Sequence, residues 1–148
     1  MNGDSVSRRF ALDSSVIIEM LLASDLSKEF VGALTSELVE GKTSEVNLAE
    51  AEYILCRKLG AETAREKISN LRDSNYVMVV DTEQASRIAA RIKCSRALAL
   101  ADCYTLATAK LAGLKALFAF REAELVHEIE KRPLDVEVVF LEDLSKSL

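Results

Sequence analysis

Short apolar segments alternate along the chain with longer segments in which apolar residues recur at helical spacing. The short segments are too brief for helices, and Tyr76–Val80 is almost wholly apolar and β-branched, as in a strand covered on both faces. The expected strands are residues 8–13, 43–46, 76–80, 114–120 and 136–141. The expected helices are residues 16–23, 26–40, 48–59, 62–72, 82–93, 95–113 and 122–131. This alternation predicts an α/β fold with a central parallel sheet of about five strands flanked by helices.

Capping residues indicate where three of these helices begin or end. Ser14 and Ser15 follow the first strand and are suitable N-caps for the helix after it. Asn47 would cap the helix after the second strand, with Glu50 three residues later in a near capping-box arrangement. Gly41 is expected to end the helix that precedes it.

The composition predicts one folded domain over residues 1–148. Of the 148 residues, 49% are hydrophobic and 29% charged, the balance of a globular protein that is long enough to bury a core. The longest apolar runs are interrupted by Glu19 and Asp102 and are too short to span a bilayer. Residues 1–8 lack the apolar core of a secretion signal, and we expect them to form a flexible N-terminal extension. A cytoplasmic protein without membrane contact is therefore expected.

The cysteines and the histidine exclude several kinds of site. Cys56, Cys94 and Cys103 are odd in number and contain no C-x-x-C pair, so they indicate neither a disulfide framework nor a zinc site. We expect them to be small core residues. His127 is the only histidine and lies in what looks like an exposed helical turn, which argues against a Ser–His–Asp triad.

The net charge of −5 gives no overall basic field for nucleic acid, so such a ligand would need a local basic patch. Arg91, Lys93 and Arg96 form the densest basic group, and Arg121 follows the strand 114–120. These four residues are candidates for contact with a nucleic acid. A purely structural explanation is also open, because basic residues near a helix C-terminus interact favourably with the helix dipole.

One carboxylate interrupts the apolar helical run 95–113. Asp102 is preceded by Ala101 and followed by Cys103, on a face that otherwise has the composition of a core. An unpaired buried carboxylate costs several kcal/mol, so this acid should cap its helix, be paired, or bind a cation. Capping in the first helical turn is the simplest explanation.

Further acids converge with Asp102 on one edge of the predicted sheet. Asp13 ends the first strand, Glu50 comes one turn into the helix after the second, and Glu122 and Glu124 follow the strand 114–120. The functional cleft of a parallel sheet lies at the carboxyl ends of its strands. Like charges gathered there oppose ionisation unless a divalent metal binds, and oxygen-only ligands favour Mg²⁺ or Mn²⁺. Such a site suits phosphodiester hydrolysis.

Each acid taken alone has another explanation. Glu50 completes a capping box with Asn47, and Glu122 and Glu124 are first-turn acids favoured by the helix dipole. Asp13 could form a turn after its strand. The agreement in position is what favours a shared site.

Three segments together resemble the PIN-domain ribonucleases, particularly the VapC-type toxins of toxin–antitoxin pairs. They are FALDSSVIIEMLL, VNLAEAEYIL and LALADCYTLATAKLAG, in that order. The family pattern has an Asp closing the first strand with small hydroxyl residues after it, a leucine-alanine-Glu segment, and an Asp followed by an alanine-rich helix. Asp13, Glu50 and Asp102 take these positions. The similarity extends over nearly the whole chain.

The fourth position departs from the family pattern. The family usually has Thr-x-Asp-x-Asp-Phe after a strand, and this chain has Phe120 in the place of the Thr. In that alignment Glu122 takes the fourth acid position and Glu124 the accessory one. The longer side chains can still reach a metal, but the geometry of a second metal is put in question.

The resemblance implies metal-dependent endonucleolytic cleavage of RNA. Asp13, Glu50, Asp102 and Glu122 would be the catalytic acids and would hold one or two Mg²⁺ or Mn²⁺ ions, with Glu124 as a further ligand. Ser15 would orient the ligands by hydrogen bonding. The family also implies a homodimer and a small antitoxin that inserts a helix or tail into the cleft.

Other classes of function remain to be weighed. An aspartyl-phosphate enzyme of the haloacid dehalogenase type would have a second Asp at position 15, where this chain has Ser15, and a receiver domain would have an acid pair that is not evident. A PIN-like domain that binds RNA or protein without cutting is the more serious alternative, because the fourth site is altered. Metal binding would separate this silent module from a nuclease.

Overall fold

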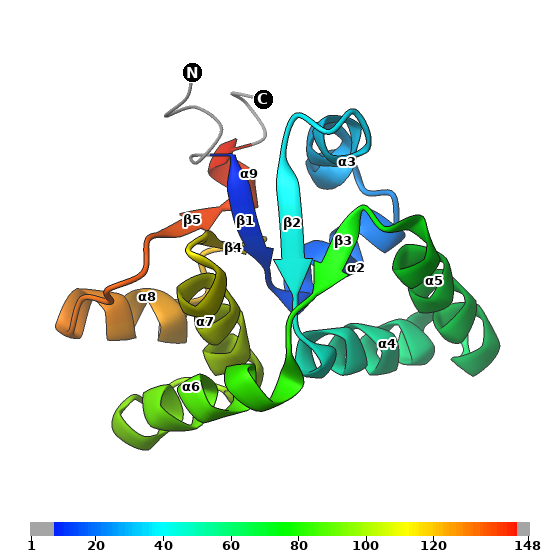
Figure 1. Cartoon of the computed structure of the whole chain (residues 1–148). Coiled ribbons are helices and arrows are strands. Elements are labelled where there is room, and N and C mark those ends of the chain that lie inside the picture. Colours follow the sequence, from blue (N-terminus) through cyan, green and yellow to red (C-terminus); the bar gives the residue numbers. More distant parts are fainter. Residues whose placement is uncertain (1–7, 145–148) are drawn as a thin grey trace.

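A five-stranded, all-parallel sheet forms the centre of the molecule (Figure 1). The structure is a computed structural model and describes residues 8–144. Its strands are β1 (Arg9–Leu12), β2 (Glu40–Thr43), β3 (Val77–Val79), β4 (Lys115–Phe118) and β5 (Val138–Phe140), in the order β3-β2-β1-β4-β5. After β1, the chain adds β2 and then β3 toward one edge of the sheet. It then crosses back to place β4 on the other side of β1. The reversal between β1 and β4 opens a crevice at their carboxyl ends, where α/β folds bind ligands.

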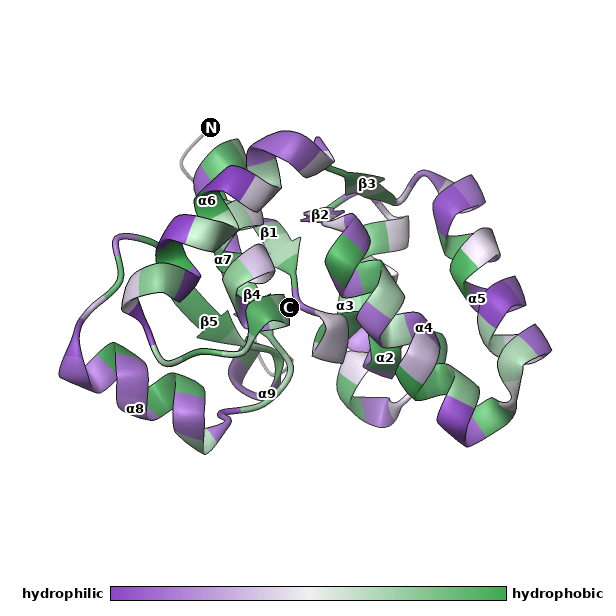
Figure 2. Cartoon of the chain, turned by 90° about the horizontal axis from the view of Figure 1, so that it is seen from below, coloured by the Kyte–Doolittle hydropathy of each residue, from purple (hydrophilic) through white to green (hydrophobic). Residues whose placement is uncertain are grey.

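Helices cover both faces of the sheet. Because successive side chains of a strand point to opposite faces, Phe10 and Leu12 pack into one core and Ala11 into the other. The two helical groups lie on opposite sides in Figure 2. The first comprises α2 (Ser14–Leu21), η1 (Asp25–Ser27), α3 (Lys28–Thr35), α4 (Glu45–Leu59) and α5 (Ala61–Ser74). The second comprises α6 (Thr82–Ser95), α7 (Leu100–Ala112) and α8 (Ala123–Lys131), and the short α9 (Leu141–Leu144) follows β5.

The predicted fold class is confirmed, because a single α/β unit with five parallel strands is flanked by helices. The helices α4 and α7 end, as predicted, at Gly60 and Gly113, whose φ angles of 94° and 68° a residue with a side chain rarely adopts. The expected extension at residues 1–8 lies, apart from Arg8, outside the described residues.

The predicted position of the second strand is wrong. The strand expected at residues 43–46 is β2, at residues 40–43, and Gly41 lies inside it rather than ending a helix. A Cβ at Gly41 would lie 2.9 Å from Cδ1 of Leu12 on β1, so close packing between the strands requires the glycine. The helix before β2 ends earlier than expected, at Thr35, and Glu37 adopts a φ of 60°.

The helix starts after β1 and β2 are also corrected. Asp13 itself caps α2, because its side chain accepts a hydrogen bond from the backbone N–H of Ser15. Ser44 caps α4 by accepting from the backbone N–H of Asn47, so Asn47 lies inside the helix. Asp102 caps nothing, since α7 begins at Leu100.

Two predictions of burial fail. Met78 of β3 is 53% exposed, because β3 is an edge strand and is not covered on both faces as expected. Cys94 is exposed and Cys56 only partly buried, so only Cys103 is a core residue. His127 is exposed, as expected. Between residues 8 and 144, no helix has the length and apolar composition needed to cross a membrane.

Candidate active site

Asp13 lies at the bottom of the crevice, directly after β1. Its backbone N–H donates to the carbonyl of Leu117 at 2.9 Å, which continues the pairing of β1 with β4 and places the side chain at the strand switch. Only 3% of the residue is exposed. Burial raises the pKa of this carboxyl, against hydrogen bonds from Thr105 and Ser15 that act to lower it. A buried carboxyl group is thus held by hydroxyl and amide donors at the carboxyl end of β1.

Ser15 links this acid to the neighbouring strand. Its Oγ donates to Oδ2 of Asp13 at 2.7 Å and accepts from the backbone N–H of Ala119 at 2.9 Å. Ala119 directly follows β4. The serine therefore fixes the start of α2 against the end of β4, the place from which the chain leads to Glu122.

A second set of hydrogen bonds, from α4 to α7, was missed in the sequence. The buried Asn47 side chain donates to Oγ1 of Thr105 at 3.0 Å and to the carbonyl of Ala101 at 3.1 Å. Thr105 in turn donates to Oδ1 of Asp13 at 2.6 Å. Three elements distant in sequence are thereby joined around Asp13. The only sequence signal is a pair of polar residues on otherwise apolar helical faces, which for Asn47 looked like an ordinary helix cap.

Asp102 lies in the first turn of α7 without a compensating donor. Among residues 8–144 the structure shows no hydrogen bond or ion pair to its carboxylate. Burial first, then the negative charges of Asp13, Glu122, Glu50 and Glu124, raise its pKa from 3.8 to about 7. The four other predicted acids are therefore all close enough to Asp102 to oppose its ionisation.

The glutamates complete this cluster at the mouth of the crevice. Glu122 occupies the N-cap position of α8 but makes no capping hydrogen bond, so its side chain does not serve as a hydrogen-bonding cap. Burial raises its pKa, and so do Asp13, Glu50 and Glu124. Glu50 is partly buried on α4, next to the Asn47 network, whereas Glu122 and Glu124 are exposed. We name these five residues, Asp13, Glu50, Asp102, Glu122 and Glu124, the acid cluster.

The donor set of the acid cluster fits a hard divalent cation. All its side chains offer only carboxylate oxygens, the ligands of Mg²⁺ and Mn²⁺. Every charged group that shifts the pKa of Asp102 or Glu122 is another carboxylate, so a cation would relieve their repulsion. Between residues 8 and 144, no three His, Cys, Asp or Glu side chains are already arranged as a ligand shell.

The four basic candidates have different surroundings. Arg96 is largely buried, with its side chain 15% exposed and paired to Glu128 at 3.3 Å. Arg121 forms an ion pair with Asp143 and lies over the ring of Phe140. Lys93 is exposed and donates to the carbonyl of Leu98 at 2.7 Å, and Arg91 is exposed. Their RNA contacts stay predictions, and the pairing of Arg96 gives that residue a structural role.

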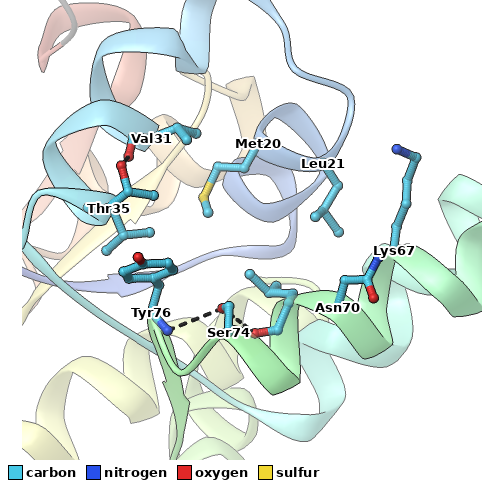
Figure 3. Close-up of a pocket in the computed structure, with 10 residues that line it drawn as sticks. Met20, Leu21, Val31, Thr35, Lys67, Asn70, Ser74 and Tyr76 are labelled. Carbon is cyan, nitrogen blue, oxygen red and sulfur yellow. Dashed lines mark hydrogen bonds between the residues drawn. The ribbon is translucent and has the colours of Figure 1, made fainter.

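An apolar pocket lies apart from the acid cluster, between α2, α3 and α5 (Figure 3). Its volume is about 290 Å³, and Met20 and Tyr76 face one another across it. Lys67 is its only charged lining residue. Most of its lining residues are apolar, so this pocket suits an apolar group.

A family model described as the PIN domain matches residues 10–142, a range that contains the whole acid cluster. The chain belongs to the PIN-domain family. The resemblance that the three motifs indicated is thereby confirmed. A comparison with curated proteins finds no match to this PIN domain.

Solved structures with the same fold include toxins and toxin–antitoxin complexes. VapC20 of Mycobacterium tuberculosis, described as a sarcin–ricin-loop-cleaving toxin, is 19% identical with a TM-score of 0.60, over 80% of this chain and 94% of its own. The DNA-bound VapBC of Salmonella typhimurium is also 19% identical, with a TM-score of 0.66 over 90% and 98%. FitAcB of Neisseria gonorrhoeae is 21% identical, with a TM-score of 0.57 over 89% and 97%. At such low identities the likeness shows the fold alone.

Proposed function

We propose that this PIN domain is a metal-dependent endoribonuclease that hydrolyses RNA phosphodiester bonds. One observation carries the proposal: carboxylates from four separate segments meet at the strand switch, where burial and then the neighbouring negative charges raise the pKa of Asp102 to about 7. A folded protein keeps such an arrangement at a cost in stability, which is expected where the charges serve a site. Divalent metal and a phosphate backbone are the partners that this charge pattern fits.

Each acid has a distinct task in the proposed reaction. Thr105 and Ser15 hold the Asp13 carboxyl in place by hydrogen bonds, so Asp13 would be a ligand with a fixed position. Asp102 and Glu50 would be further ligands on the side of the ion that faces the protein. Glu122 and Glu124 are exposed and would close over the ion when RNA is bound. When bound, Mg²⁺ or Mn²⁺ supplies an activated water and neutralises charge at the phosphate. Because Glu replaces the usual Asp at the fourth position, we leave open one ion or two.

We further infer that the protein is the toxin of a toxin–antitoxin pair. The neighbours described as VapBC and FitAcB, together with VapC20, support this inference. A homodimer and a small antitoxin would then be its protein partners in the cytoplasm.

The test is cleavage of a mixed pool of RNAs by the purified protein at increasing Mn²⁺. We expect cleavage that EDTA abolishes and that Asp13→Asn abolishes without unfolding the protein. Glu122→Gln decides whether the fourth acid is needed, and Glu130→Gln, an exposed glutamate of the same helix outside the acid cluster, is its matched control. Cleavage that persists in EDTA or in Asp13→Asn would refute the metallonuclease.

The silent binding module remains the second candidate. Its support is the fourth position, where Phe120 replaces the usual Thr, and the absence between residues 8 and 144 of a preformed ligand shell. Calorimetric titration with Mn²⁺ separates the two. A folded, partner-free protein that neither binds Mn²⁺ nor cleaves RNA would establish the silent module.

A further inference from the structure

A second concave surface continues from the acid cluster along α8. It lies between residues 97–99 and α8, has a volume of about 510 Å³, and its lining includes Lys93, Leu98 and His127. Glu124 belongs both to this pocket and to the acid cluster. Residues 97–99 also lead directly into α7, which carries Asp102 in its first turn. The pocket is therefore an extension of the proposed catalytic cleft and not a separate site.

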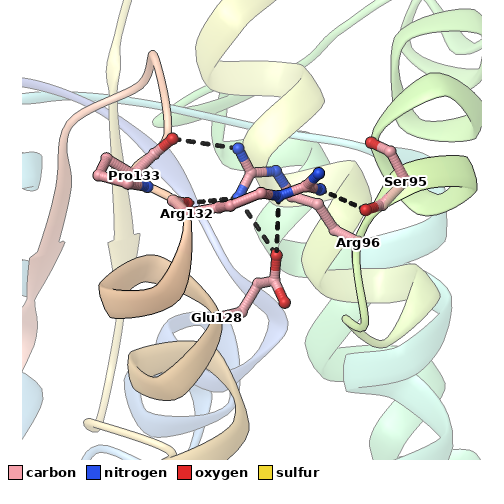
Figure 4. A network of polar contacts seen from close by, with 5 residues as sticks. All are labelled: Ser95, Arg96, Glu128, Arg132 and Pro133. Atoms are coloured by element: carbon pink, nitrogen blue, oxygen red, sulfur yellow. Dashed lines mark hydrogen bonds and ion pairs between the residues drawn. The ribbon is translucent and has the colours of Figure 1, made fainter.

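A buried ion pair and several hydrogen bonds hold the wall of this pocket in place (Figure 4). Arg96, next to residues 97–99, pairs with Glu128 at 3.3 Å and donates to the carbonyl of Pro133 at 3.1 Å. Arg132 donates to the carbonyl of Ser95 from the other direction. The Glu128 side chain is only 7% exposed. Because these contacts tie the segment before α7 to α8 on both sides, the pocket is formed before any ligand binds.

The lining has the chemistry of a nucleotide site. The His127 imidazole is exposed, and such a ring offers a flat face on which an unpaired RNA base can stack. Lys93 uses one ammonium hydrogen for the carbonyl of Leu98, which leaves others for a phosphate oxygen. Leu98, Ala97 and Ala99 supply the apolar part of the surface.

We propose that this pocket binds one nucleotide of the RNA strand beside the cleaved phosphate, with its base stacked on His127 and a phosphate on Lys93. This inference takes its substrate, RNA, from the proposed function, but the residues that it concerns, His127 and Lys93, lie outside the acid cluster. It makes His127 a specificity-determining residue and gives the chain's single histidine a role outside catalysis.

The first arm of the test measures binding without cleavage. A fluorescein-labelled single-stranded RNA is titrated with the Asp13→Asn protein, alone and combined with His127→Ala, His127→Phe or Lys93→Ala. Loss of one stacked base should weaken binding about 5- to 100-fold in His127→Ala, and the aromatic ring of His127→Phe should largely restore it. Lys93→Ala should also flatten the salt dependence of binding by about one phosphate contact. Lys131→Ala, one turn further along α8, is the matched control and should bind normally.

The second arm locates the RNA and follows cleavage. Photo-crosslinking of RNA that contains 4-thiouridine should label residues 97–99 or the α8 peptide with His127. In the otherwise unmutated protein, His127→Ala should change the distribution of cleavage positions and raise KM, while Mn²⁺ affinity stays unchanged.

The outcomes separate this proposal from the nuclease itself. If RNA crosslinks to the pocket and binding depends on His127 but no variant cleaves, the nucleotide site stands and the nuclease fails. If metal-dependent cleavage is seen but His127→Ala and Lys93→Ala bind and cleave like the unmutated protein, the nucleotide site is overturned and the nuclease stands. Absence of RNA binding by the folded protein overturns both.

Discussion

Asp102 should make the metal-free protein less stable as the pH rises. Its pKa is raised from 3.8 to about 7 by burial and by the other acids, a shift of about three units. At about 1.4 kcal/mol per unit, ionising this carboxyl in the folded protein costs ~4 kcal/mol. Asp102 is partly exposed, so solvent screening reduces the net effect to ~2 kcal/mol.

The direction follows from where the proton is held more tightly. Between pH 3.8 and about 7, Asp102 is ionised in the unfolded chain but still protonated in the folded one, so the folded state binds more protons. The free energy of unfolding therefore falls as the pH rises through this window and levels off above it. Asp13 and Glu122, whose pKa values are also raised, add in the same direction.

Urea unfolding followed by circular dichroism, in EDTA at pH 5 and pH 8, measures the effect. Asp102→Asn should be ~2 kcal/mol more stable than the unmutated protein at pH 8 and should lose much of the pH dependence. Mn²⁺ at pH 8 should stabilise the unmutated protein but not Asp102→Asn, because the ion needs the carboxylate. Asp135→Asn is the control: its ion pair with Lys110 lowers the pKa of Asp135, so its titration lies below this window and the slope should persist.

An Asp102→Asn protein no more stable than the unmutated one at pH 8 would refute the repulsive cluster. So would an unmutated protein whose stability is the same at pH 5 and pH 8. In either case, the carboxylates would not oppose one another in the metal-free fold, and the argument for a cation would lose its electrostatic basis.

Three further changes test the packing around the site by urea unfolding. Asn47→Ala should cost about 2–4 kcal/mol, because it leaves buried partners on α2 and α7 unsatisfied, whereas the exposed Asn70→Ala should change stability by less than about 0.5 kcal/mol. Gly41→Ala should cost about 1–3 kcal/mol, because the new Cβ would lie 2.9 Å from Cδ1 of Leu12 on β1. Gly32→Ala is the control: no atom lies within 4 Å of a Cβ at this position of α3, so the substitution should stabilise the helix by up to about 1 kcal/mol. Arg96→Ala should cost about 1.5–3 kcal/mol, because it removes the nearer partner of the buried Glu128 and leaves only Arg132, whose Nε lies 3.8 Å from that carboxylate. A loss below about 1 kcal/mol would show that the Arg96 ion pair does not hold the pocket wall.

Local patterns were enough to predict the kinds of elements and their order. The helical spacing of apolar residues and the short apolar segments depend on neighbours within a few residues, and they identified every strand of the sheet, although β2 was misplaced. The position of Asp13 at the end of a strand could likewise be predicted from its immediate neighbours in the sequence. Gly41 was misjudged because its reason is a close approach to Leu12 on another strand, which no local pattern records.

The relations between distant residues came from the tertiary structure. Thr105 donates a hydrogen bond to Asp13, which lies 92 positions away in the chain, and Asn47 donates one to Thr105, 58 positions away. These contacts form only because the order of the strands in the sheet brings the three residues together. The burial of Arg96 against Glu128 likewise requires α8 to pack beside the start of α7. Periodicity predicts which face of an element is apolar, but it does not say which element that face will meet.

The acid cluster shows both contributions together. The sequence by itself supplied five carboxylates at the ends of predicted strands and the starts of predicted helices, and thus the choice of oxygen ligands. The burial of Asp102 and the mutual repulsion of the carboxylates, which together raise the pKa of Asp102, exist only because the crossing between β1 and β4 brings the carboxyl ends of these strands together. Charge is a property of the residue, but the energy of a charge depends on its burial and on the distance to its neighbours, which only the folded chain sets.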